Sequence, residues 1–352
     1  MTRSPRDSQS NRLRAVFLPL VVAVLLATAG CGGALQGGDT SNAPETGISD
    51  VPSGVDLVAS MDVNGMLQDD AHRQIIQTYL NLQANRSTYD GPTSIAGALG
   101  DIRNDTGIAP KKINDALVYG KMETGTQYLG IIVTTAQQQD DFVSGIRDNA
   151  DFEFEQGSYN GHTVYRPKSE MAASSSYIGV LGDKKYVLGT EEAVKDAIDV
   201  AKGNASTVSG PVRSAYENTR DGYIRFAASV PQDQLPAEEI GEGSQFNTGV
   251  FNDVTTVSGA HYTDGDTVGV KLTLSFSSKD SAGKATDITS GAVQLYRGVI
   301  SDSPAKPMLS EENLTISQSG KALVITSENP TSRYTTVLKF LFASNLGMGP
   351  TV

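Results

Sequence analysis

The sequence predicts an α+β fold in which helices pack on one face of a mainly antiparallel sheet. Segments that alternate apolar and polar residues, as half-buried strands do, occur in pairs joined by turn residues such as Asp264-Gly265 and Ser319-Gly320. Segments with apolar residues three or four positions apart, the spacing of one helix face, lie between these pairs. The order of segments before residue 212 recurs after it, which predicts an internal duplication of a strand-hairpin-helix-hairpin-helix unit.

The first copy is expected to span residues 51–212. Its first strand, 55–63, alternates apolar and polar positions. The helix after it carries apolar residues four positions apart, at Leu67, Ala71, Ile75 and Tyr79. Thr135 and Gln138 are spaced as a capping box, which predicts a helix start there. The other elements follow in chain order: a helix at 93–103, a hairpin of 116–119 and 128–135 turning at 123–126, strands at 152–155 and 162–165, a hairpin at 177–189 and a helix at 191–201.

The second copy is expected to span residues 213–352. A strand at 224–230 and a polar loop at 231–252 precede the hairpin that turns at Asp264-Gly265. A helix then follows, with a stripe predicted to face the core: Ile288, Ala292, Leu295 and Val299. A hairpin at 314–327 leads to a final apolar helix at 334–347. The sequence leaves open whether the two copies form one continuous sheet or two lobes.

The N-terminal 30 residues have the order of a secretory signal peptide. Arginines precede the uncharged run 15–27, and the small residues Ala29 and Gly30 follow it. The run is interrupted by Pro19 and is shorter than the roughly 20 apolar residues that cross a membrane. We therefore expect residues 1–30 to be removed on export, with a retained signal anchor as the alternative.

Cys31, the only cysteine in the chain, follows this segment directly. Thr28-Ala29-Gly30-Cys31 resembles a lipobox, the site at which a lipoprotein is cleaved and its cysteine is linked to lipid, although Thr28 stands where the motif usually has Leu. The resemblance implies that Cys31 is lipidated. The remainder of residues 31–50 is rich in Gly, Ser, Thr and Asp and has little to bury, which predicts a flexible tether.

The charge of the chain limits the kinds of molecule that it is expected to bind. The net charge is −12 at pH 7, and removal of residues 1–30, which carry four arginines and one aspartate, changes it to −15. Nucleic acid is not expected as a partner, because phosphate binding requires clustered Lys and Arg. With no second cysteine there is no disulfide, so the exported part must be stabilised by its core.

Acidic patches such as Gln68-Asp69-Asp70 and Gln139-Asp140-Asp141 accompany the lipobox and the tether, in a chain without Trp. In these features, and in segments such as DGYIRFAASVP and YVLGTEEAVKDAID, the chain resembles uncharacterised secreted lipoproteins of haloarchaea. The resemblance implies a high-salt habitat, where a Debye length of about 3 Å screens an acidic surface from itself. It implies no activity. An ordinary acidic surface kept for solubility is the alternative.

Four Asn-X-Ser/Thr sequons begin at Asn85, Asn104, Asn204 and Asn313. They fit N-glycosylation of an exported protein. Chance also supplies such sequons in a chain rich in Ser and Thr.

The sequence shows no catalytic, cofactor or metal site. His72 is expected on the exposed side of a helix and His162 and His261 in strands, at spacings that match no zinc ligand set. Ser281-Ala282-Gly283-Lys284 has the Ser-x-x-Lys pattern without its companion motifs, so Ser281 is interpreted as a helix-start residue. Asp264-Gly265-Asp266 lacks the glutamate of a calcium loop and is interpreted as a turn. No phosphate-binding glycine motif occurs.

The final helix is expected to be part of the core, since it is too short to span a membrane and contains Lys339. The features together predict a lipid-anchored extracytoplasmic protein at the cell membrane, non-catalytic and binding an unidentified protein or small molecule. A solute-binding lipoprotein of a transporter and an exported hydrolase are the alternatives. A cleft between two lobes would favour the first alternative, and a pocket with converging titratable groups would favour the second.

Overall fold

The computed structural model describes residues 47–85, 90–121, 128–150, 152–168, 177–230, 248–300 and 303–345. Cys31, the signal peptide and the turn predicted at 123–126 lie outside these residues. Residues 47–50, predicted as the end of the tether, belong to the fold. Ile48–Asp50 forms the 3-10 helix η2, and the Asp50 carboxylate lies 3.0 Å from the Lys185 ammonium.

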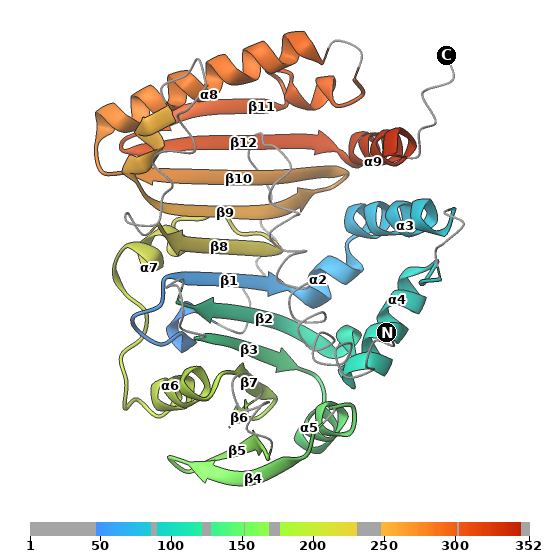
Figure 1. Cartoon of the computed structure of the whole chain (residues 1–352), viewed down its shortest axis with the longest axis vertical. Coiled ribbons are helices and arrows are strands. Elements are labelled where there is room, and N and C mark those ends of the chain that lie inside the picture. Colours follow the sequence, from blue (N-terminus) through green and yellow to red (C-terminus); the bar gives the residue numbers. More distant parts are fainter. Residues whose placement is uncertain are drawn as a thin grey trace, which may run out of the picture.

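One twelve-stranded sheet runs through the described residues (Figure 1). Its order is β11-β12-β10-β9-β8-β1-β2-β3-β7-β6-β5-β4, and the pairings are antiparallel. The predicted α+β class and antiparallel sheet are thus confirmed. The strands are β1 (Leu57–Asp62), β2 (Ile113–Gly120), β3 (Leu129–Thr135), β4 (Phe154–Tyr159), β5 (His162–Pro167), β6 (Tyr177–Gly182), β7 (Lys185–Gly189), β8 (Ile224–Ser229), β9 (Val254–Asp264), β10 (Thr267–Phe276), β11 (Leu314–Ser319) and β12 (Ala322–Pro330).

The two halves of the chain meet at the centre of the sheet, where β1 pairs with β8 from Leu57–Ala228 to Met61–Ile224. Outward from this pair, the first half runs β1-β2-β3-β7-β6 and the second half runs β8-β9-β10-β12-β11. Corresponding strands therefore occupy corresponding places, and β5 and β4 extend the first half beyond the shared order. The sheet is continuous rather than divided into two lobes. Its origin by duplication stays a hypothesis, and residue 212, the predicted boundary, lies inside α7.

Helices cover both faces of the sheet, whereas the sequence predicted one face. Neighbouring residues of a strand point to opposite faces. In β2, Leu117 belongs to the core under α6 and α7, and Ala116 belongs to the core under α5. Directly paired residues of neighbouring strands point to the same face of the sheet. Following these pairs from Ala116 through β1, β8, β9 and β10 to β12 shows that Leu323, under α8, lies on the same face as α5. The helices are α2 (Val63–Gln68), α3 (Asp70–Ala84), α4 (Ile95–Thr106), α5 (Gln139–Asp148), α6 (Glu191–Ala201), α7 (Gly210–Glu217), α8 (Lys279–Val299), α9 (Thr331–Asn345) and the 3-10 helices η3 (Pro110–Lys112), η4 (Thr248–Asp253) and η5 (Lys306–Leu309).

Helix α6 has the bounds that the sequence predicted. The Thr190 hydroxyl accepts a hydrogen bond from the Ala193 N–H and caps the first turn. One stripe of the helix is fully buried against the sheet, comprising Ala193, Val194, Ala197 and Ile198.

The start of α5 differs from the prediction. Gln138, not Thr135, is its N-cap residue, and the Gln138 side chain makes no capping hydrogen bond. Thr135 ends β3 instead, and its hydroxyl donates to the Lys112 carbonyl. The predicted capping box is therefore wrong, because the strand continues to the residue that was expected to cap the helix.

Helix α8 also differs from the prediction, because most of the predicted core stripe faces outward. Leu295 is 60% exposed and Val299 is 77% exposed. The fully buried side chains of α8 lie in its first two turns, where Ala282 and Ala285 contact the core that contains Leu323. The apolar spacing correctly indicates a helix, but the sheet under α8 offers a core too small for its whole length.

None of the helices in the described ranges has the combination of length and hydrophobicity needed to cross a membrane. Helix α9 lies against α3 beside the ends of the strands (Figure 1), where Tyr79 and Phe342 meet edge to face at 5.7 Å between ring centroids.

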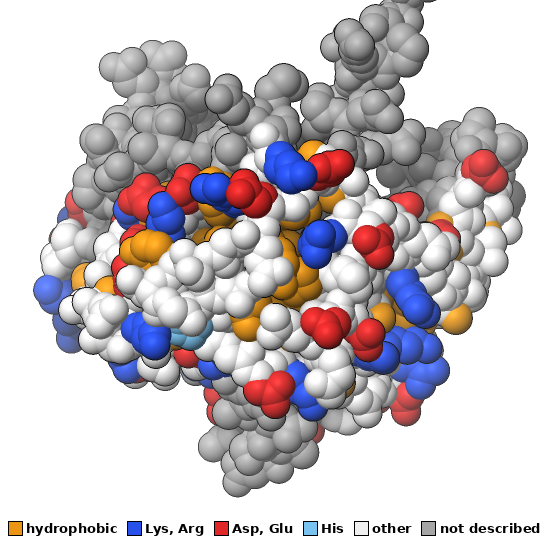
Figure 2. Space-filling view, turned by 90° about the horizontal axis from the view of Figure 1, so that it is seen from below, with side chains coloured by type: hydrophobic (Ala, Val, Ile, Leu, Met, Phe, Trp, Pro, Cys, Tyr) orange, Lys and Arg blue, Asp and Glu red, His pale blue; other side chains and the backbone are white. Residues whose placement is uncertain are grey.

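The sheet ends at β4 in a surface of mixed charge. Ion pairs link this edge to β5, with Glu155 to Arg166 at 3.1 Å and Glu153 to Lys168 at 2.6 Å. Figure 2 shows positive and negative side chains side by side around a hydrophobic area at this end of the molecule. Charged groups on an edge strand oppose pairing with another chain.

Candidate functional site

Two histidines that lie far apart in the sequence meet inside the fold. His72 Nε2 and His261 Nε2 are 2.6 Å apart, and the two rings are nearly perpendicular, at 82°. His72 is 6% exposed and His261 9% exposed. The prediction that His72 lies on the exposed side of its helix is therefore wrong. His261 lies in a strand, as expected.

Asp69 is the reason that His72 faces the sheet. The sequence predicted one helix from Leu67 to Tyr79, but the chain turns at Asp69, which ends α2 and is the N-cap residue of α3. The Asp69 carboxylate accepts from the His72 N–H at 2.8 Å. An aspartate in this position stabilises the first turn of a helix. The turn changes the buried face of α3 to Ala71, His72 and Leu80.

Strand register places His261 opposite this turn. His261 pairs with Ile224 on β8 and with Val270 on β10, and direct partners in a sheet point to the same face. That face is the one that carries α5 and α8, and α3 approaches it at the end of β9.

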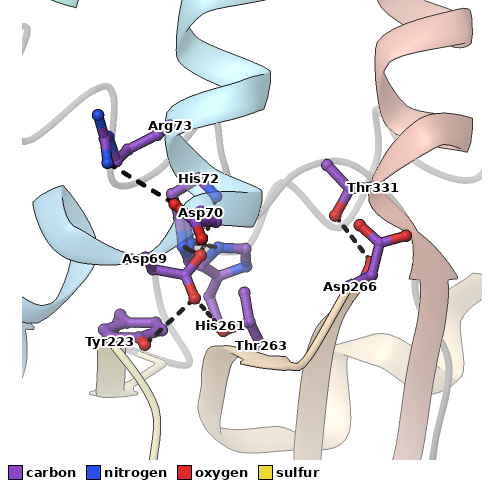
Figure 3. Close-up of polar contacts among 9 residues, drawn as sticks. All are labelled: Asp69, Asp70, His72, Arg73, Tyr223, His261, Thr263, Asp266 and Thr331. Carbon is purple, nitrogen blue, oxygen red and sulfur yellow. Dashed lines mark hydrogen bonds and ion pairs between the residues drawn. The ribbon is translucent and has the colours of Figure 1, made fainter.

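Asp69 joins His72, and through it His261, to neighbouring side chains (Figure 3). Its Oδ1 accepts from His72 Nδ1 at 2.7 Å, and its Oδ2 accepts from the Thr263 hydroxyl at 2.8 Å. The Tyr223 hydroxyl reaches Oδ2 at 3.4 Å, and its ring meets the edge of the His72 ring at 5.0 Å. We call Asp69, His72, Tyr223, His261 and Thr263 the histidine cluster.

The hydrogen bonds fix the tautomers of the uncharged pair. An ionised carboxylate only accepts, so His72 Nδ1 carries a proton and its Nε2 is an acceptor. His261 must then donate from Nε2, which leaves its Nδ1 as a bare acceptor. His261 Nδ1 is buried and has no partner of hydrogen-bond geometry, although the backbone of Gly269 is near enough to favour the protonated ring. The cluster therefore contains one unsatisfied ring nitrogen.

Burial determines the direction of the pKa shift of both histidines, whereas hydrogen bonds determine that of Asp69. Burial lowers the pKa of His72, against the opposing hydrogen bond and charge of Asp69. It lowers the pKa of His261 to about 3, and a charge on His72 acts in the same direction. Burial would raise the pKa of Asp69, but hydrogen bonds from the His72 backbone, the Thr263 hydroxyl and the His72 ring outweigh it and lower that pKa. At neutral pH the cluster holds a carboxylate and two uncharged imidazoles.

The cluster does not fit a metal ion. Zinc–nitrogen bonds of about 2.0–2.1 Å at a tetrahedral angle separate two ligand nitrogens by roughly 3.3 Å. The two Nε2 atoms are closer, at 2.6 Å. Among the residues that the structure describes, no group of three or more His, Cys, Asp or Glu side chains is arranged to hold a metal.

The cluster also lacks the parts of a nucleophilic triad. Asp69 orients His72 as the acid of a triad orients its base, but His72 Nε2 faces His261 instead of a hydroxyl or thiol. The Thr263 hydroxyl is bonded to Asp69. The arrangement can hold or release a proton within the fold.

The other residues singled out by the sequence are dispersed. Ser281 lies in the first turn of α8, where its hydroxyl donates to Asp253 at 2.5 Å, and Lys284 pairs with Asp280 at 2.6 Å. His162 Nδ1 donates to the Val180 carbonyl, 2.7 Å away on β6.

The four sequons occupy different surroundings. Asn85, Asn104 and Asn204 are exposed, with Asn104 inside α4. Asn313 is half-buried, and its amide donates to the Pro307 carbonyl at 2.8 Å and to the Ser310 hydroxyl at 2.6 Å. A glycan on Asn313 would replace one of the two amide hydrogens and so remove at least one of these hydrogen bonds.

A shallow groove of about 310 Å³ lies between α7 and strands β9 and β10, on the face opposite the histidine cluster. Its floor carries hydroxyl groups from both strands, and α7 forms one wall. The lining residues are Pro211, Ser214, Ala215, Asn218, Thr255, Thr256, Ser258, Thr273 and Ser275. The groove contains no charged group, so it can offer hydrogen bonds but no acid, base or nucleophile of shifted pKa.

No family model matches the chain, and no curated protein matches its sequence. Among solved structures, three crystal forms of TP0453 are similar. Form III gives a TM-score of 0.45 at 12% identity over 86% of this chain and 100% of that chain. Forms I and IV give 0.43 at 14% and 13% identity, over 86% and 83% of this chain and 98% and 95% of those chains. A similarity with a TM-score below one half does not indicate a function for this chain.

Proposed function

We propose that the chain is an extracytoplasmic surface protein, held to the cell membrane by lipid on Cys31, whose role is non-catalytic binding of a partner. The observation that carries the proposal is the position of its single cysteine, directly after a basic-apolar-small segment. A thiol kept at this one place is suited to modification, and it cannot form a disulfide within the chain.

The distance between Cys31 and the fold supports this role. Gly47 begins the described fold, and its N–H donates to the Asp50 carboxylate. Nearby, Val51 accepts from the Val208 N–H at 2.8 Å, so the entry of the chain is fastened to the segment before α7. Residues 32–46 can extend by about 3.3 Å each, which gives a reach of roughly 50 Å. A lipid at Cys31 would therefore leave the folded part free to meet a partner above the membrane surface.

The continuous sheet favours this role over that of a solute receptor. Receptors that close around a solute need two lobes that move about a hinge. Here the halves are joined by main-chain pairing of β1 with β8, over five residue pairs. A movement between the halves would break that pairing. The hydroxyl-lined groove beside α7 is open on one side and offers a surface for a polar partner rather than an enclosed cavity.

Hydrolysis is the less favoured alternative. In the histidine cluster, the His72 and His261 imidazoles are buried and bonded to each other, and Asp69 is half-buried and bonded to His72. A substrate would have to separate the two imidazoles before it could reach either Nε2.

The test of the anchor is Cys31→Ser in the native host, with Ser41→Ala in the same segment as control. We expect wild type and control to be cleaved before Cys31 and to sediment with membranes. Cys31→Ser should be released into the medium or should keep its signal peptide, because the site of cleavage and lipidation is lost. Two acyl chains hold a protein at a membrane where one binds only marginally, so partial release is not expected of the wild type.

A Cys31→Ser protein that is cleaved at the same bond and still membrane-bound would contradict the proposal. An uncleaved wild type would point instead to a retained signal anchor.

A further inference from the structure

Helix α3 is fastened to the sheet by the histidine cluster. Away from its first turn, α3 rests on α9 through the edge-to-face pair of Tyr79 and Phe342. At its first turn, the hydrogen bonds to β9 come from Asp69, which binds Thr263, and from His72, which binds His261. This junction is polar and buried, so its strength depends on how many protons it holds.

Proton counting shows what the closed pair can accept. The uncharged pair has two ring protons, one on His72 Nδ1 and one shared between the Nε2 atoms. A third proton fits at His261 Nδ1, where the Gly269 backbone favours it and the Asp69 charge balances it. A fourth proton would place two N–H groups against each other at an Nε2 separation of 2.6 Å. The fourth proton cannot be bound while the rings remain in contact.

We infer that His72, Asp69 and His261 form a proton-operated latch, which is closed while the two imidazoles share one Nε2–H and opens when each Nε2 carries its own proton. Opening releases the N-terminal turn of α3 from β9, while α3 keeps its contact with α9. The latch regulates the position of one helix on the fold. It does not depend on lipidation of Cys31, so the two proposals can fail separately.

The groups that face the pair from each packed element are few. Asp69, at the start of α3, is the carboxylate in contact with it, and Tyr223 contributes a hydroxyl and a ring edge from the segment before β8. Strand β10 contributes the Gly269 backbone. Asp70 and Arg73 pair with each other at 3.6 Å on the outer side of α3, where Asp70 is fully exposed. In this part of the described chain, the net charge around the pair is therefore set by one carboxylate and by the protonation of two imidazoles.

The size of the effect follows from proton linkage. In the open state both histidines recover an ordinary pKa of about 6.5, so the open state binds at least one proton more than the closed state in acid. The equilibrium constant for opening should then rise by about 100-fold between pH 7.5 and pH 4.5.

The experiment is hydrogen–deuterium exchange of the full mature protein between pH 7.5 and 4.5, read at residues 70–84. Each exchange rate is divided by the intrinsic rate of the unfolded chain at the same pH, and residues 191–201 of α6, which are packed by apolar side chains, report opening of the whole fold. Protection of 70–84 is expected to fall by about 100-fold in acid while staying below that of 191–201. Unchanged protection of 70–84 between the two pH values would overturn the latch.

His261→Gln and His162→Gln are the matched variants. Glutamine at position 261 can donate to His72 Nε2 at neutral pH and can turn its amide oxygen toward a protonated His72 in acid. The facing N–H groups are then avoided, so the loss of protection in acid should disappear. The control His162→Gln, on β5, should show the same loss of protection in acid as the wild type. Loss of protection that persists in His261→Gln would overturn the inference.

If His261→Gln does not fold, nitrogen NMR of the imidazoles in the wild type decides the question. The latch predicts that the His72 and His261 rings gain their last protons together with the loss of α3 protection, below pH 6.5. Titration of both rings near pH 6.5 with α3 protection unchanged would contradict it.

Discussion

The two halves of the sheet share a strand order but are packed differently. In the first half, cores lie on both faces, one under α6 and the other under α5, and the α6 core continues at the centre of the sheet under α7, which packs on β8 and β9. In the second half, the core under α8 is small, and the end of β9 is joined to α3 by the histidine cluster. Two halves with the same strand order are therefore stabilised differently: apolar burial dominates the first, and hydrogen-bonded polar groups contribute more to the second.

The helices α6 and α8 show the difference most clearly. Ile198 on α6 is fully buried, whereas Leu295 on α8 is 60% exposed. Both residues belong to apolar stripes of similar spacing in the sequence. The surface beneath each helix decides which stripe is buried.

The largest expected effect on the free energy of unfolding is that of Ile198→Ala, which removes packing between α6 and the sheet in the first half. Truncating a fully buried Ile leaves a cavity and costs about 2–5 kcal/mol of unfolding free energy. Urea denaturation at constant pH and salt measures the change. A loss below about 1 kcal/mol would show that α6 does not stabilise this half as its burial indicates.

The next largest effect is the loss of unfolding free energy in acid, which distinguishes polar from apolar stabilisation. Burial lowers the pKa of both His72 and His261 in the folded state, so the unfolded chain binds more protons as the pH falls below about 6.5. The stabilisation is complete above that pH and is lost as the pH falls toward the folded pKa values, by about 1.4 kcal/mol per pH unit for each proton that the unfolded chain binds and the folded chain does not. Urea titrations between pH 7 and 5 should show this slope in wild type and in His162→Gln.

In His261→Gln the slope should be smaller, because the buried His261 imidazole is removed and the glutamine oxygen can accept from a protonated His72. An unchanged slope in this variant would assign the acid sensitivity to groups outside the histidine cluster.

The smallest effect is expected for Leu295→Ala, the partner of Ile198→Ala in the comparison. Because Leu295 projects from the unpacked part of α8, its truncation should change the unfolding free energy by no more than about 0.5 kcal/mol. A loss equal to that of Ile198→Ala would mean that the two helices are packed alike in solution.

Local patterns predicted much of the fold. The bounds of α6 follow from Thr190 as N-cap residue and from a stripe with helical spacing, and both signals are contained within the helix itself. The hairpin of β9 and β10 follows from Asp264-Gly265, since Gly265 adopts the positive φ, +58°, that such a turn requires. Features of this kind depend on neighbours in the sequence, and a single sequence contains them.

Features that depend on distant packing were missed. The face of α8 is set by how much core β10 to β12 provide, which its own spacing does not contain. The histidine cluster joins His72 to a residue 189 positions away. The one local signal was Asp69, an aspartate three residues before a histidine, which is compatible with a helix start whose third residue carries an imidazole. The signal at Cys31, by contrast, is local, which is why the sequence alone carries the proposed anchor.

The most direct measurement for the proposed function is the intact mass of the native mature protein, followed by sequencing of its N-terminal peptide. We expect a chain that begins at Cys31 and carries the added mass of a lipid on that residue. A chain that retains Met1, or one with an unmodified thiol at position 31, would contradict it.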